Sequence, residues 1–104
     1  MKRIAAFLAL MTTSSMLHAA CLVPSSFWDW PRSGEAILSS KEMQPCISAY
    51  LADSKSTLII RHGTGVDSAL HADELRAWLI SLAVNPSRIH DAADLPEGLS
   101  IENH

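Results

Sequence analysis

Apolar and polar positions alternate along this chain with a spacing that changes from one segment to the next. From Met43 to Leu51 apolar side chains recur every three or four residues, which predicts an amphipathic helix with Pro45 in its first turn. An earlier helical turn is expected at Ser39, because Glu42 follows three residues later in the pattern of a capping box.

Short apolar blocks bounded by polar residues predict the strands. The block 57–60 (TLII) is rich in β-branched side chains and predicts a buried strand. Shorter strands are expected at 88–90 and at 99–102, with a polar loop over 91–98 between them.

A second helix is predicted between the first two of these strands. Apolar residues repeat at helical spacing from Leu70 to Leu82, Asp67 or Ser68 is placed to cap the start, and Pro86 is placed to stop the helix. The predicted fold class is therefore α+β, a small two-layer sandwich with two helices on one face of a three- to four-stranded sheet.

The first twenty residues have the pattern of a secretory signal peptide. Lys2 and Arg3 precede a short apolar run, and small residues lead to a cleavage point after Ala19 or Ala20. The apolar run is shorter than a membrane-spanning helix needs, and an N-terminal buried helix is the alternative interpretation. We expect a periplasmic protein made of a signal peptide (1–20), an irregular proline-containing segment (21–33) and one small α+β domain (34–104).

Charge and length restrict the possible functions. The whole chain has 104 residues and a formal net charge of −3. Loss of residues 1–20 removes two basic and no acidic side chains, which leaves six basic against eleven acidic residues and a net charge of −5. An acidic domain has no electrostatic basis for binding nucleic acid. The sequence contains no second long apolar run, so we expect no stable membrane insertion after the signal peptide is removed.

Two cysteines, Cys21 and Cys46, occur in the chain. In an oxidising compartment they are expected to form one disulfide that ties the N-terminal segment to the domain. The alternatives are a lipid-bearing Cys21, which His18 three residues earlier disfavours, and two free thiols.

Two patterns of catalytic or metal-binding residues are present only in part. Arg61-His62-Gly63 after the predicted strand is similar to the Arg-His-Gly signature of histidine phosphatases, in which the His is phosphorylated beside an Arg. Only 42 residues follow His62, too few to complete that pocket. The histidines lack the paired spacing of a metal site, so we predict no bound metal or cofactor. The sequence shows no set of nucleophile, base and orienting group, so we predict that the protein is not an enzyme.

The second half of the chain resembles the OmpA-like periplasmic domains. In that family a helix ending L-x-x-x-G-V is followed, after three further residues, by R-I at the start of a strand. The matching residues here are Leu79, Ala83, Val84, Arg88 and Ile89. Ala83 stands where the family usually has glycine. Upstream, residues 59–64 (IIRHGT) are similar to the family's strand and turn I-x-G-H-T-D, and the similarity spans about residues 40–102 with gaps.

The resemblance implies the family's fold and, in its ordinary form, binding of peptidoglycan. OmpA-like domains hold the diaminopimelate of peptidoglycan with an Asp after the H-T step and an Arg at the start of the next helix. Here the Arg position is His71, and the Asp is displaced to Asp67 or absent. A mostly neutral histidine does not reproduce the bidentate grip of arginine on a carboxylate.

We therefore predict an exported, non-catalytic envelope module that binds a protein partner or a cell-wall peptide. The expected binding residues are Arg61, His62, Asp67 and His71, in the loop between the best-defined strand and helix. The alternative for this loop is a solvated turn. The alternative functions are a phosphatase-like enzyme using residues 61–63 and a structural subunit of an envelope complex.

Overall fold

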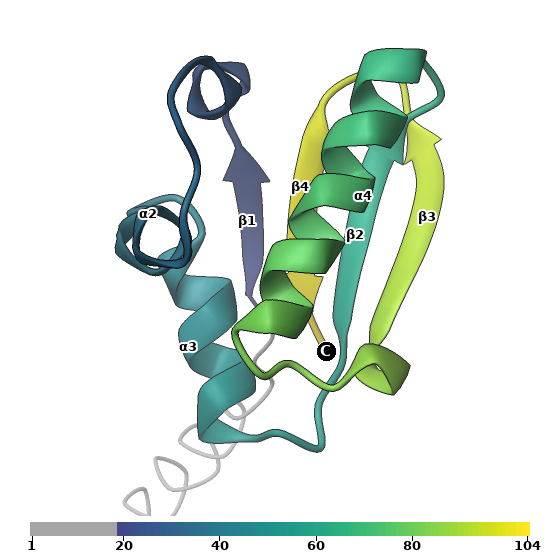
Figure 1. Cartoon of the computed structure of the whole chain (residues 1–104). Helices are drawn as coiled ribbons and strands as arrows, with labels where there is room; N and C mark the ends of the chain where they lie inside the picture. Colours follow the sequence, from purple (N-terminus) through teal and green to yellow (C-terminus); the bar gives the residue numbers. More distant parts are fainter. Residues whose placement is uncertain (1–18) are drawn as a thin grey trace, which may run out of the picture.

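The computed structural model describes residues 19–104, in which three α-helices and a four-stranded sheet form a two-layer arrangement (Figure 1). In chain order the elements are β1 (Ala20–Val23), the 3-10 helix η2 (Ser25–Asp29), α2 (Gly34–Ser39), α3 (Gln44–Ala52), β2 (Leu58–Gly63), α4 (Val66–Ser81), the 3-10 helix η3 (Pro86–Arg88), β3 (Ile89–Leu95) and β4 (Leu99–Asn103). The predicted α+β sandwich is confirmed. Residues 1–18 of the predicted signal peptide lie outside the described residues.

The sheet is mixed and has the strand order β1-β4-β2-β3. Strand β3 runs parallel to β2, and β4 returns antiparallel between β2 and β1. The loop from β3 to β4 therefore crosses the carboxyl end of β2. This crossing places residues 96–98 beside the start of α4.

Helices α3 and α4 cover one face of the sheet, and the shorter helix α2 packs against both of them (Figure 1). Alternate residues of β2 and β4 point into this layer, so Leu58, Ile60 and Ile101 are fully buried against apolar side chains of the helices such as Leu75 and Leu79. The opposite face of the sheet carries polar and charged side chains such as Arg61 and Glu102, together with the apolar side chains of Leu22 and Ile59.

The structure corrects several predicted boundaries. Helix α2 was not predicted, because its six residues contain too little apolar periodicity; Ser33 caps it by accepting a hydrogen bond from the N–H of Ala36 at 3.0 Å. The capping box expected at Ser39 is wrong, since α2 ends there. Strand β3 extends through most of the predicted loop 91–98, because a polar strand at a sheet edge shows no apolar signal.

The ends of α4 also differ from the prediction. Its N-cap is Gly65, and neither Asp67 nor Ser68 occupies that position. The helix ends at Ser81, before the proline that was expected to stop it. Ala83 follows with a positive φ of 76°, the left-handed conformation in which many helices terminate.

The N-terminal segment is an integral part of the domain. Strand β1 pairs with β4, so the prediction that residues 21–33 are irregular is wrong at its start. The strand was missed because four residues before a proline give no strand pattern. The predicted disulfide is confirmed: Cys21 in β1 is bonded to Cys46 in α3, and both side chains are buried. Within residues 19–104 no helix is long and apolar enough to cross a membrane.

Candidate binding site

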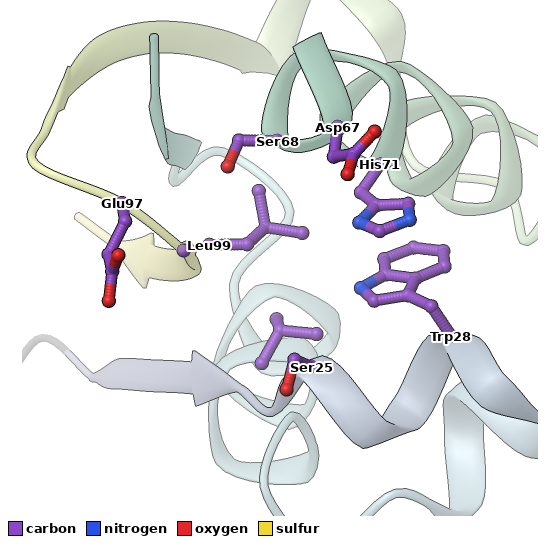
Figure 2. Close-up of a pocket in the computed structure, with 9 residues that line it drawn as sticks. Ser25, Trp28, Asp67, Ser68, His71, Glu97 and Leu99 are labelled. Carbon is purple, nitrogen blue, oxygen red and sulfur yellow. The ribbon is translucent and has the colours of Figure 1, made fainter. Parts of the chain in front are cut away.

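A pocket of about 360 Å³ opens between the start of α4, the β1–η2 connection and the loop that crosses the end of β2 (Figure 2). Its lining residues come from three separate parts of the chain: Val23, Ser25, Trp28, Asp67, Ser68, His71, Glu97, Gly98 and Leu99. The floor is apolar, because Val23 and Leu99 belong to the core, whereas the mouth is polar.

Trp28 and His71 form one wall of the pocket. Their rings are stacked, with centroids 4.4 Å apart and planes inclined by 4°. Figure 2 shows the two rings lying parallel, with the indole nitrogen of Trp28 on the side that faces the pocket. Phe27 packs edge-on against Trp28 at a centroid distance of 5.1 Å, so the tryptophan is held by contacts from both η2 and α4.

Arg32 fixes this wall to α4. Its guanidinium donates two hydrogen bonds to the carboxylate of Glu74, at 2.7 and 2.9 Å, and others to the carbonyl oxygens of Trp28 and Trp30 at 3.1 and 3.0 Å. Trp78 donates its indole N–H to the same carboxylate at 3.0 Å. The hydrogen bonds from Arg32 are the main cause of a lowered pKa of Glu74, which keeps this bridge charged.

The opposite wall depends on a close backbone approach at Gly63. A Cβ atom at this residue would lie 2.8 Å from the Cα of Glu97, and the N–H of Gly63 donates to the carbonyl of Gly98 at 3.0 Å. Glycine is needed here because the crossing loop passes directly over the end of β2. The contact holds Glu97 opposite Asp67, which belongs to the first turn of α4.

The structure brings together two of the four predicted binding residues. Asp67 and His71 line the pocket, one turn apart on α4. His62 does not line it; its Nδ1 is 2.8 Å from the carbonyl oxygen of Gly63. Arg61 extends to the open face of the sheet, because neighbouring strand residues point to opposite faces.

Carboxylates surround Arg61 on that open face. Its Nε donates to Glu102 at 2.9 Å, and Nη1 donates to Asp94. Hydrogen bonds from His104 and, next, Arg61 lower the pKa of Glu102. An arginine already engaged by two carboxylates, on the other side of the strand from His62, has the wrong surroundings for holding a phosphate beside that histidine.

Sequence reasoning missed Trp28 and Glu97 as pocket residues. Trp28 stood out as a large aromatic in a proline-containing segment, but that signal does not distinguish a core residue from a binding residue. Glu97 gave no signal at all. Among residues 19–104 no group of three or more His, Cys, Asp or Glu side chains is arranged to hold a metal ion.

Comparison with known proteins gives no match among family models, curated proteins or solved structures.

Proposed function

We propose that this chain is an exported, non-catalytic binding module of the cell envelope, and that it holds a segment of a protein partner in the pocket beside α4. The observation that carries the proposal is the convergence of Asp67 and His71 on one pocket with Trp28, a residue from a distant segment. Pockets with an apolar floor and a few polar groups are typical of binding sites.

Export is supported by two features. The pattern of residues 1–20 is that of a signal peptide. The buried Cys21–Cys46 disulfide supports export, since disulfides persist in oxidising compartments such as the periplasm and cytosolic thiols are kept reduced.

The composition of the pocket favours a protein segment over peptidoglycan. The resemblance to OmpA-like domains suggests a cell-wall ligand, but the carboxylates of diaminopimelate require a permanent cation. No lysine or arginine is among the nine lining residues, and His71 stands where the family has arginine. A neutral or cationic peptide segment avoids the repulsion that a carboxylate would meet near Asp67 and Glu97.

Two binding assays test the proposal. The exported protein is mixed with isolated peptidoglycan sacculi in one assay and with a detergent extract of the envelope in the other. We expect it to retain a specific envelope protein and to leave the sacculi unbound. The His71→Ala and Trp28→Ala variants should lose that protein, whereas His90→Ala, an exposed histidine on β3, should keep it.

Three results would contradict the proposal. Binding to sacculi that His71→Ala abolishes would indicate a cell-wall ligand. A partner retained equally by wild type and both pocket variants would place the binding surface elsewhere. Turnover of a phosphomonoester that His62→Ala abolishes would indicate the phosphatase-like alternative.

A further inference from the structure

We infer that the pocket receives the cationic side chain of a lysine or arginine from the partner segment, with the aliphatic part of that side chain on the apolar floor. The inference depends on the proposed binding function and specifies its ligand chemistry. It follows from the charge, the hydrogen-bonding groups and the apolar surfaces that the pocket brings together.

Two carboxylates at the mouth of the pocket have no partner among the described residues. Asp67 lines it from α4 and Glu97 lines it from the crossing loop on the other side (Figure 2), and neither forms a hydrogen bond or an ion pair within residues 19–104. By contrast, Glu74 and Glu102 are each bound by an arginine. Two unpaired carboxylates among the lining residues make the mouth of the pocket negatively charged, which favours a cationic ligand group there.

The pocket also offers one hydrogen-bond donor on a rigid support. The indole N–H of Trp28 has no acceptor among the described residues, and it faces the pocket from a ring held by the His71 stack (Figure 2). A peptide segment supplies a matching acceptor, because each of its residues carries a backbone carbonyl. The indole N–H of Trp28 can therefore donate a hydrogen bond to a backbone carbonyl of the bound peptide, next to the residue that carries the cationic side chain.

The apolar surfaces match the remainder of such a segment. Val23 and Leu99 form a floor on which the methylene groups of lysine or arginine can pack while the charged end stays at the mouth.

The test uses matched peptides and the 15N-labelled protein purified with its disulfide formed. The probes are acetyl-Ala-Leu-Lys-Leu-Ala-amide and the same peptide with norleucine or glutamate in place of lysine; norleucine keeps the aliphatic chain and lacks the ammonium. Titrations follow the indole N–H signal of Trp28 by NMR. We expect the lysine peptide to bind about tenfold more tightly than the norleucine peptide, a difference of about 1.4 kcal/mol.

Charge-removing variants locate the effect. Asp67→Asn combined with Glu97→Gln should abolish the preference for lysine over norleucine. Asp73→Asn combined with Asp91→Asn makes the same change in net charge at exposed positions outside the pocket and should preserve it. Raising the ionic strength should weaken binding of the lysine peptide more than that of the norleucine peptide.

The possible outcomes separate this inference from the proposed function. Equal binding of the lysine and norleucine peptides at the pocket, or tighter binding of the glutamate peptide, would overturn the cationic ligand and leave the binding function standing. Absence of any shift at Trp28 at about 10 mM lysine peptide, an affinity weaker than about −3 kcal/mol, would also overturn it. A soluble muropeptide that binds the pocket more tightly than the lysine peptide would replace the protein segment with the cell wall. Failure of the envelope-capture assay would contradict the proposed function itself.

Discussion

Replacing Ala83 by glycine should stabilise the protein. Ala83 follows α4 with φ at 76°, a conformation in which the Cβ of an L-residue crowds its own backbone. The helix end is otherwise well formed: the N–H of Ala83 donates to the carbonyl of Ile80, and that of Val84 donates to Leu79, both at 3.0 Å. This pair of bonds is the Schellman arrangement, in which glycine is the preferred residue.

The size of the effect is a difference of two terms. Relief of the left-handed conformation is worth roughly 1–2 kcal/mol for a residue other than glycine. Glycine also increases the conformational freedom of the unfolded chain, which costs about 0.4–1 kcal/mol. The methyl group of Ala83 is exposed, so its removal sacrifices little packing. We expect a net gain of about 0.5–1 kcal/mol, or a rise in Tm of about 2–8 °C for a domain of this size.

Chemical and thermal denaturation of the purified protein measure this gain, and Ala77→Gly is the matched control. Ala77 is also exposed but lies within α4, where glycine should cost about 1 kcal/mol because it lowers helix propensity. The same chemical change should therefore have opposite signs at the two positions. A destabilised or unchanged Ala83→Gly variant, alongside an Ala77→Gly variant that behaves as expected, would refute the reasoning.

The remaining predictions concern the disulfide, the loop crossing and one ion pair. Replacing Cys21 and Cys46 together by serine opens a loop of 25 residues and should lower the free energy of unfolding by about 3 kcal/mol; denaturation of both forms without reductant measures this loss. Gly63→Ala should cost about 1–3 kcal/mol, because the new methyl group meets backbone, whereas Gly65→Ala, with open space around the added atom, should be nearly neutral; equal effects would contradict the crossing geometry. The pKa of Glu74 is lower in the folded than in the unfolded protein. The contribution of Glu74 to the free energy of unfolding is therefore fully present above the ordinary glutamate pKa and is lost as the pH falls through the lowered value. Glu74→Gln should flatten the curve of unfolding free energy against pH in that acidic range, which denaturation at a series of pH values measures.

The sequence by itself determined the fold class, the buried strand β2 and the central helix α4. Each has a local cause, since a β-branched apolar block and a helical repeat of apolar residues require a core on one side. The presence of two cysteines in a chain with a signal-peptide pattern also predicted the disulfide between Cys21 and Cys46. The segment 99–102 was likewise predicted as a strand, and the structure shows it within β4, paired on both sides.

Tertiary structure decided the weak elements and the composition of the pocket. Strand β1 exists because β4 lies beside it, and polar β3 exists because β2 offers it a parallel partner. Local sequence is a poor guide to such elements, because their backbone hydrogen bonds are made with residues far along the chain.

The same reason explains the site. Asp67 and His71 were identified because they share a helix start, where local spacing predicts proximity. Trp28 and Glu97 reach them through tertiary contacts such as the Arg32–Glu74 bridge and the loop that crosses Gly63, which join segments more than thirty residues apart in sequence. The pocket therefore depends on the tertiary fold, because only the folded chain brings together the three segments that line it.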